Sequence, residues 1–433
     1  MNISNLPVFY KKLDSEFLLT NNELTNATYT NVDCNFVFSS KYARHRWFNY
    51  KEGFSPVLVD KVFKEYNLNS NSIVCDPFCG AGTTLAVAKA NGMQSYGFEV
   101  NPFAAFITKV KTNDYTLSDK DSLLTYYKLL TEIDIDVNIE LPLNEYLCRI
   151  FSKDMLIVQL NIKKFIMLLP EGNSKDLLYF AWLCTLEETS LFRKAGNGLK
   201  KKKNPPKYMD ARQFALDLLY KRLNSIIEDF NICDNGPIPS IVQDSATTIK
   251  DNISDESVDL VLFSPPYANC FDYTKIYYLE LWFGGFVEST QGQKDIRMKS
   301  VRSHCHATWP ERYTSFHLTE LNDEILPLLK EQKLWTKRIP DMLNGYFADM
   351  EEILKQIYNV LKKGGHCNIV VSNSAYAGII VPTDVLLAKI AKQIGFKVNE
   401  IQVERLIITS SQQYKKTESL RKYLRESTVK LEK

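Results

Sequence analysis

The feature that most restricts the fold of this chain is a short apolar strand that runs directly into a glycine-bearing turn. Residues 72–75 form the apolar run, Asp76 follows it, and the turn PFCGAG comes next. A helix is expected immediately behind the turn, over residues 83–90. In doubly wound α/β sheets, ligands bind at such strand ends, where backbone N–H groups of a helix N-terminus can approach them.

A second strand, expected over residues 95–98, ends at another acidic residue, Glu99. Asp76 and Glu99 should therefore both lie at the carboxyl ends of neighbouring parallel strands. A carboxylate at the position of Glu99 can hold the hydroxyl groups of a ribose. The pair predicts a nucleotide-like ligand at this edge of the sheet.

The turn matches neither the dinucleotide pattern GxGxxG nor the phosphate loop GxxxxGK. Asp76 precedes the glycines, where its charge would repel a pyrophosphate. A cationic cofactor is therefore favoured over a dinucleotide, and S-adenosylmethionine has a positive sulfonium and amino group. Its carboxylate can use the backbone amides of the turn. The alternative is a turn with a purely structural role.

A third strand, expected over residues 258–263, leads directly into Ser264, Pro265, Pro266 and Tyr267. The two prolines make the corner rigid and fix the Pro265 carbonyl and the Ser264 hydroxyl as acceptors. Two acceptors on the hydrogens of an aromatic amine favour a pyramidal, more reactive nitrogen, and Tyr267 can stack on a base. Taken alone, a Pro-Pro-Tyr turn is equally compatible with a structural role.

Together and in this order, DPFCGAGTT, GFEVNP (97–102) and SPPY (264–267) resemble the amino-methyltransferases of DNA restriction-modification systems. The SPPY form resembles the cytosine-N4 branch, since adenine-N6 enzymes usually carry Asp in place of Ser264. The resemblance covers residues 45–112 and 240–275 by motif, and 345–433 by the LKKGG crossover. It implies a Rossmann-like class I S-adenosylmethionine-dependent methyltransferase fold: a mostly parallel sheet with helices on both faces, plus a helical insertion.

The resemblance also implies roles for individual residues. Asp76, Phe78 and the loop glycines would line the methionine portion of the cofactor, Glu99 would hold its ribose, and Asp244 would contact its adenine. Ser264, Pro265, Pro266 and Tyr267 would be the catalytic residues, acting on a base swung out of the DNA helix. The cofactor contacts expected in full are Phe54, Ser55, Pro56, Asp76, Pro77, Phe78, Gly80, Gly82, Thr83, Glu99, Val100, Asn101, Asp244 and Ser245.

Changes in pattern along the chain predict its organisation. Residues 1–44 are expected to be an extended arm, and residues 45–112 and 233–433 a catalytic core. Within the core, 280–345 is expected to be a second inserted segment. Residues 113–232 show helical periodicity and almost no strand pattern, so a helical insertion is expected there, as a candidate DNA-recognition region. Further helices are expected from residue 56, capped by Ser55 and ending near 67–71, at 347–361 and at 384–394, with strands near 397–409 and 426–432.

Any polyanionic partner must meet a local basic surface, because the formal net charge is only +2. The strongest local feature is RKAGNGLKKKKNPPK (193–207), which predicts a flexible cationic loop. In it Lys200, Lys201, Lys202 and Lys203 either contact nucleic-acid phosphates or form an ordinary solvated loop. A second basic stretch, 415–425, leaves the same two alternatives open.

No metal is expected, since His304, Cys305 and His306 lack the usual zinc spacing. Cys79, inside the glycine turn, is expected to be a small buried filler, because amine methylation needs no thiolate. The nine cysteines lack a paired CxxC framework, the first residues lack a signal-peptide core, and no apolar run approaches about 20 residues. A cytoplasmic protein without membrane contact is expected.

The sequence therefore predicts a site-specific DNA methyltransferase that acts on the N4 amine of cytosine within a restriction-modification or related defence system. Double-stranded DNA with a flipped base would be its substrate, and a cognate restriction endonuclease its partner. Adenine N6 or an amine of an RNA base are alternative targets. A non-catalytic nucleic-acid-binding module is a third hypothesis, which Asp76, Glu99 and SPPY disfavour.

Overall fold

The three apolar runs before Asp76, Glu99 and Ser264 form adjacent parallel strands in the computed structural model. β2 (Ile73–Asp76) lies between β3 (Gln94–Phe98) and β7 (Val258–Phe263), and the register pairs Asp76 with Gly97 and Cys75 with Val261. All three strands run in the same direction, so their polar carboxyl ends meet at one edge of the sheet. This arrangement was predicted from the sequence and is confirmed.

These strands belong to an eight-stranded sheet with the order β1-β11-β12-β8-β7-β2-β3-β6. The run from β8 to β6 is parallel throughout, and β12 is antiparallel to both β8 and β11. The expected Rossmann-like, mostly parallel sheet is therefore confirmed. The remaining strands of this sheet are β1 (Leu19–Thr20), β6 (Ser240–Val242), β8 (Leu361–Ser372), β11 (Lys397–Leu406) and β12 (Arg425–Glu432). β9 (Ser374–Tyr376) and β10 (Ile379–Val381) form a separate antiparallel pair. The structure describes residues 3–21, 39, 41–50, 52–141, 144–196, 198–232, 236–309, 315–408 and 411–433.

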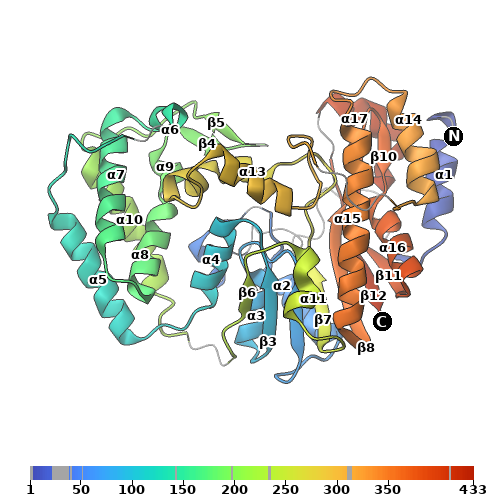
Figure 1. Ribbon diagram of the computed structural model, residues 1–433, viewed down its shortest axis with the longest axis horizontal. Helices are drawn as coiled ribbons and strands as arrows, with labels where there is room; N and C mark the ends of the chain where they lie inside the picture. Colours follow the sequence, from blue (N-terminus) through green and yellow to red (C-terminus); the bar gives the residue numbers. More distant parts are fainter. Residues whose placement is uncertain are drawn as a thin grey trace.

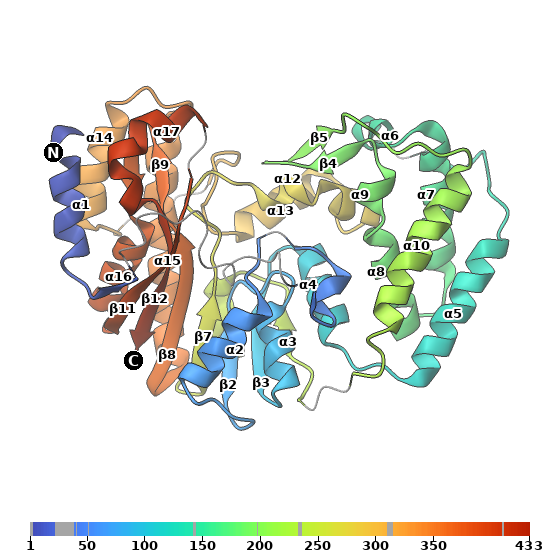
Figure 2. The ribbon, with the colours of Figure 1, turned by 180° about the vertical axis from the view of Figure 1, so that it is seen from behind.

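Alternate residues of the central strands face opposite layers of helices, as the two-residue period of a strand requires. Val74, Leu260 and Leu262 pack toward α2 (Pro56–Glu65) and α3 (Thr83–Ala90). Cys75, Val261 and Phe263 pack toward the other side, which α15 (Ile339–Val360) and α16 (Thr383–Ile394) cover. Figure 1 shows α11 and α15 in front of the sheet, and Figure 2, from behind, shows α2 and α3. Both faces of the sheet are therefore buried.

The helices within residues 113–232 lie beside the β6 edge of the sheet (Figures 1 and 2) and pack around an apolar core that they share with residues of 47–50, 103–110 and 276–296. Leu178, Phe180 and Trp182 are fully buried in this core. The helices follow the periodicity of the sequence, while the status of 113–232 as a separate insertion remains a prediction. They are α5 (Leu117–Glu132), α6 (Glu145–Ile150), α7 (Lys153–Leu168), α8 (Asn173–Leu183), α9 (Leu186–Thr189) and α10 (Ala211–Ile227), preceded by α4 (Pro102–Thr112).

The expectation of an extended arm over residues 1–44 is wrong in its first part. Residues 3–5 form a 3-10 turn, α1 (Leu6–Asp14) follows, and β1 pairs in parallel with β11. Leu6, Tyr10 and Leu13 are spaced along one face of α1 and are buried. The hydroxyl of Tyr10 donates to the carbonyl of Ile380 and accepts from its N–H, both at 2.9 Å. Residues 1–2, 22–38 and 40 of the predicted arm lie outside the described residues.

The flexible loop expected over residues 193–207 is also wrong, because its first part is a β-hairpin. β4 (Phe192–Lys194) pairs antiparallel with β5 (Leu199–Lys201), and the N–H of Ala195 donates to the carbonyl of Gly198 at 2.8 Å. Gly196 takes the positive φ of +57° that such a tight turn needs. The glycines mark a turn between two short strands.

The segment over 280–345, whose status as a second insertion remains a prediction, contains several helices and follows α12 (Tyr273–Ile276). They are the π-helix η6 (Leu279–Phe283), which starts one residue earlier, α13 (Thr290–Lys299), the π-helix η7 (Glu320–Ile325) and α14 (Leu326–Lys330). α15 begins at Ile339, earlier than the predicted residue 347. Near the C-terminus, α17 (Ser411–Thr417) and the 3-10 helix η8 (Glu418–Tyr423) precede β12. Three further short helices are η4 (His45–Trp47), η5 (Ala246–Thr248) and α11 (Ile249–Asn252). Among the described residues, no helix is both long enough and apolar enough to span a membrane.

Candidate active site

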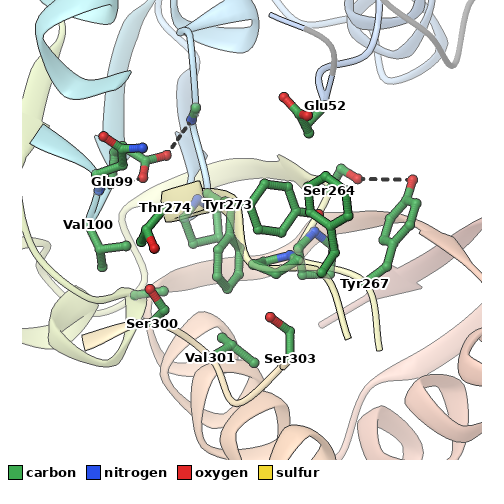
Figure 3. Close-up of a pocket in the computed structure, with 18 of the residues that line it drawn as sticks. Glu52, Glu99, Val100, Ser264, Tyr267, Tyr273, Thr274, Ser300, Val301 and Ser303 are labelled. Atoms are coloured by element: carbon green, nitrogen blue, oxygen red, sulfur yellow. Dashed lines mark hydrogen bonds between the residues drawn. The ribbon is translucent and has the colours of Figure 1, made fainter. Parts of the chain in front are cut away.

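A cavity of about 350 Å³ opens at the edge where β2, β3 and β7 end. Figure 3 shows Glu99 on one side of it and Ser264 with Tyr267 on the other. The two strand ends predicted to face each other thus share one cavity. Of the expected site residues, those on its wall are Pro77, Phe78, Gly80, Glu99, Val100, Asn101, Asp244, Ser245, Ser264, Pro265, Pro266 and Tyr267.

The glycine turn brings bare backbone to this cavity. Gly80 and Gly82 have φ values of +51° and +73°, in the left-handed region. A Cβ on Gly80 would lie 2.9 Å from the ring of Tyr50, and one on Gly82 would lie 2.6 Å from Cγ2 of Thr108. Both positions therefore exclude side chains, and the turn leads into the N-terminus of α3. The turn therefore lets a ligand approach the backbone without a side chain in between, although the N–H groups of Phe78, Gly80 and Gly82 already donate within the protein.

Two carboxylates hold the turn and the cavity floor. Asp76 is buried and accepts from the N–H of Phe78 at 3.0 Å and the hydroxyl of Thr84 at 2.7 Å. Glu99 accepts from the N–H groups of Gly80 at 2.9 Å and Asn101 at 2.8 Å. Burial raises the pKa of each carboxyl to about 7. Among the described residues no Lys, Arg or His forms an ion pair with either group, so the site favours a cationic ligand.

Asn101 leaves a buried donor unused at the cavity wall. Its side-chain oxygen caps α4 by accepting from the N–H groups of Phe103 at 3.0 Å and Ala104 at 3.4 Å. Its Nδ2 is buried and has no hydrogen-bond partner in the described part of the chain. A buried unsatisfied donor is costly, so it indicates a ligand acceptor at this point.

Ser264 begins a chain of hydrogen bonds between residues of the cavity wall. Its hydroxyl donates to the Tyr267 oxygen at 3.4 Å, and the Tyr267 hydroxyl donates to Glu426 at 2.6 Å. Nε of Arg405 donates to the other oxygen of Glu426 at 2.5 Å. Burial and the Glu426 carboxylate raise the pKa of Tyr267 well above its ordinary value, so the phenol keeps its proton. The direction of this chain leaves the Ser264 lone pairs as acceptors.

Some expected cofactor residues do not reach the cavity wall. Phe54 packs in the core beside α2, and the hydroxyl of Ser55 caps that helix by accepting from the N–H of Val57 at 3.1 Å. Pro56 occupies the first turn of the same helix, and Glu52 and Gly53 line the cavity instead. Asp76, Gly82 and Thr83 lie behind the wall and shape the turn from there.

Asp244 lines the cavity but already has partners. It accepts from the N–H of Ser245 at 2.8 Å and pairs with Lys299 at 3.1 Å. Partial burial opposes ionisation, yet the Ser245 N–H and the Lys299 ammonium outweigh it and lower the pKa of Asp244. Its carboxylate is therefore charged at neutral pH and available to accept from an amine.

Several cavity residues were missed by sequence reasoning. Glu426 and Arg405 come from β12 and β11, more than 100 residues after SPPY, and Tyr273 comes from α12. The only local signal for Glu426 was a charged residue inside an otherwise buried strand. His304, weighed as a metal ligand, lines this cavity, and the described residues contain no group of three potential metal ligands. Cys79 is buried, as expected for a filler.

The four lysines proposed for nucleic-acid contact do not share one environment. Lys200, Lys201 and Lys203 are exposed. Nζ of Lys202 instead donates to the carbonyls of Glu187 at 2.6 Å, Glu188 at 3.1 Å and Ser190 at 2.9 Å. The expectation for Lys202 is therefore wrong, because its three donors are used within the protein.

The sequence of this chain is similar to a known protein family and to several characterised relatives. The N6_N4_Mtase family model, described as DNA methylase, matches residues 20–110. Type II methyltransferase M.AvaI of a Nostoc species is 29% identical over 83% of this chain and 80% of its own length. Type II methyltransferase M.BsoBI of Geobacillus stearothermophilus is 29% identical over 82% of this chain and 78% of its own. Type II methyltransferase M.MvaI of Kocuria varians is 22% identical over 82% of both.

A solved structure, that of TrmN from Thermus thermophilus, aligns with 93% of this chain and 53% of its own. The identity is 9% and the TM-score 0.30. A likeness at this level supports no conclusion about the present chain.

Proposed function

We propose that this chain, which is a member of the DNA amino-methyltransferase family, transfers a methyl group to the N4 amine of cytosine at specific sites in DNA. The observation that carries the proposal is the single cavity that joins the glycine turn and Glu99 to the Ser264 corner. One end of the cavity suits a cationic nucleoside, and the other presents acceptors to an amine. DNA methylation is supported by the family match and by the relatives.

The residues at the first end fit S-adenosylmethionine, the cofactor of this family. Glu99 lines the cavity and suits its ribose hydroxyls, and the negative charge of Glu99, with Asp76 behind the wall, suits its positive charge. The space beside Gly80, which no side chain fills, suits its methionine portion. The unused Nδ2 of Asn101 suits an acceptor on its nucleoside. When bound, S-adenosylmethionine supplies the electrophilic methyl group.

Ser264 and the Pro265 carbonyl are proposed to accept the two N–H groups of the target amine. A serine hydroxyl has one proton and two lone pairs, and its proton is directed toward Tyr267. Only a donor such as an amine then satisfies its free lone pairs. Ser264 and the Pro265 carbonyl would hold the amine with its nitrogen lone pair free toward the methyl group that S-adenosylmethionine would supply. The ring of Tyr267, held by Glu426, is proposed to stack on the base.

The choice of cytosine N4 rests on Ser264, because the resemblance associates a serine at this position with the cytosine branch. The direct test is to methylate duplex DNA with labelled S-adenosylmethionine, digest the product to nucleosides and separate them. We expect the label in N4-methylcytosine. Label in N6-methyladenine would contradict the cytosine assignment, and preferential labelling of RNA would contradict the choice of DNA.

The proposal extends to the setting of the reaction. A base that leaves the helix is required because a paired amine inside the duplex cannot be reached in line. A partner endonuclease is proposed from the type II relatives. The cytoplasmic location remains a prediction of the sequence.

We expect the affinity for S-adenosylmethionine to rise about tenfold between about pH 6 and about pH 8. With a pKa of about 7, Asp76 and Glu99 are largely protonated at the lower pH. A cationic ligand favours the carboxylates, so binding releases protons and strengthens as the pH rises through 7. The same raised pKa destabilises the ligand-free fold over this rise, because the folded state binds more protons than the unfolded state.

Titration calorimetry in two buffers of different ionisation enthalpy measures this proton release. The Glu99→Gln variant is the control, because it removes one of the two groups and should release fewer protons. An affinity of the unchanged protein that is flat from about pH 6 to about pH 8 would contradict the assignment of these carboxyls to cofactor binding.

A further inference from the structure

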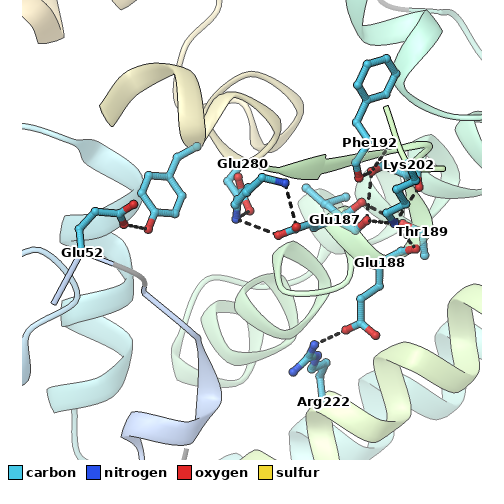
Figure 4. A network of polar contacts seen from close by, with 12 residues as sticks. Glu52, Glu187, Glu188, Thr189, Phe192, Lys202, Arg222 and Glu280 are labelled. Atoms are coloured by element: carbon cyan, nitrogen blue, oxygen red, sulfur yellow. Dashed lines mark hydrogen bonds and ion pairs between the residues drawn. The ribbon is translucent and has the colours of Figure 1, made fainter. Parts of the chain in front are cut away.

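The β4–β5 hairpin carries two sets of cations with different environments. Lys194 and Lys202 are both engaged within the protein, and Figure 4 shows Lys202 among its partners. Nζ of Lys194 pairs with the buried Glu280, lies 3.7 Å from Glu187, and sits over the rings of Phe48 at 5.1 Å and Tyr277 at 4.8 Å. Lys202 is bound to three carbonyls. These contacts anchor the hairpin at its base.

The second set is exposed to solvent. Arg193, Lys200, Lys201 and Lys203 are all exposed, and no ion pair to them occurs among the described residues. Arg193 is directly opposite Lys200 in the strand register. Like charges in opposite positions destabilise a strand pair. No acidic residue occurs between Leu191 and Met209 to offset this repulsion, so the arrangement favours an anionic ligand.

The hairpin lies at the rim of the cavity. A Cβ on Gly198, in its turn, would be 3.9 Å from Cβ of Lys275 on α12. The same short helix places Tyr273 and Thr274 on the cavity wall. Figures 1 and 2 both show β4 and β5 beside α13, and Figure 2 shows them beside α12 as well. The exposed cations are therefore outside the cavity but next to it.

We infer that this hairpin is a DNA-backbone clamp, in which Arg193, Lys200 and Lys201 contact phosphates of the duplex beside the flipped base. The inference rests on the proposed function. A base that enters the cavity leaves its flanking phosphates at the rim, where the exposed cations of the hairpin lie. Phosphate contacts position the protein without reading sequence, and an anchored hairpin fixes where the backbone runs. Duplex DNA is favoured because these cations are beside the cavity assigned to the base.

The test compares Lys200→Gln/Lys201→Gln with the matched pair Lys363→Gln/Lys392→Gln. Lys363 and Lys392 are also exposed. Lys363 lies near the amino end of β8, and Lys392 lies in the last turn of α16, just before the amino end of β11, so both are at the end of the sheet opposite the cavity. For the hairpin pair, the slope of log Kd for duplex DNA against log salt concentration should fall by about 2, with weaker binding on the order of tenfold at moderate salt. The control pair should keep the slope of the unchanged protein.

An equal slope in the two pairs would overturn the clamp. A loss confined to duplex RNA, with DNA binding intact, would also overturn it. The affinity of the hairpin variant for S-adenosylmethionine should be unchanged, which shows that it is folded. Because this readout is binding, it is independent of which nucleoside is methylated: an N6-methyladenine product would contradict the proposed function and leave the clamp standing.

Discussion

Replacing Ser264 by alanine is expected to lower kcat on the order of 100-fold, with the affinity for S-adenosylmethionine unchanged. The serine oxygen is proposed to hold one N–H of the amine in the orientation that exposes its lone pair, and alanine has no acceptor. Removal of one such preorganised hydrogen-bonding group typically costs about 100-fold to 1000-fold in kcat. Single-turnover methylation of duplex DNA measures the effect.

Tyr267→Phe refines this prediction. It removes the hydroxyl that accepts from Ser264 and donates to Glu426, while the ring stays. We expect a smaller loss, about tenfold, because Ser264 keeps its oxygen but loses its fixed orientation. Ser257→Ala is the matched control: Ser257 is at the opposite end of the same strand and its hydroxyl donates to the carbonyl of Ser254 at 2.7 Å. An unchanged kcat in Ser264→Ala would remove the serine from the reaction.

The central part of the site was predictable because its information is local. Asp76, Glu99 and Ser264 each follow a short apolar run, and parallel strands place their carboxyl ends along one edge. Once the runs at 72–75, 95–98 and 258–263 are assigned as strands, the meeting of these residues follows. The glycine turn was predictable for the same reason, since its sequence lies between a strand and a helix.

The second layer of the site was not predictable because it depends on strand order. Glu426 reaches Tyr267 only because β12 pairs with β8, which in turn pairs with β7. No local pattern near residue 426 specifies that neighbour. Charged residues in a buried strand are a signal that a partner exists, but they do not identify it.

The hairpin shows a different limit. Its lysines look alike in the sequence, yet Lys202 is held by three carbonyls while Lys201 is exposed. A run of one residue type gives no signal of which member is held within the protein, because every position carries the same letter. The N-terminal helix was missed for a related reason: its apolar residues are not confined to one helical face, and only Leu6, Tyr10 and Leu13 are buried.

Replacing Gly82 by alanine is expected to weaken S-adenosylmethionine binding about 100-fold. The residue has φ +73°, which costs an alanine about 1 kcal/mol. Its Cβ would lie 2.6 Å from Cγ2 of the buried Thr108, and overpacking of this kind costs about 1 to 3 kcal/mol. Thr108 also donates to the carbonyl of Gly80 at 2.8 Å, so its displacement would move the turn that faces the cofactor.

Gly364→Ala separates the two causes of this loss. Gly364 has nearly the same backbone, with φ +75°, but no described atom lies within 4 Å of an added Cβ. It is in β8, at the end of the sheet away from the cavity. The variant should lose about 1 kcal/mol of stability and keep its affinity for S-adenosylmethionine, measured by calorimetry. If Gly82→Ala also binds normally, Thr108 yields without moving the turn, and cofactor binding does not depend on close packing behind the turn.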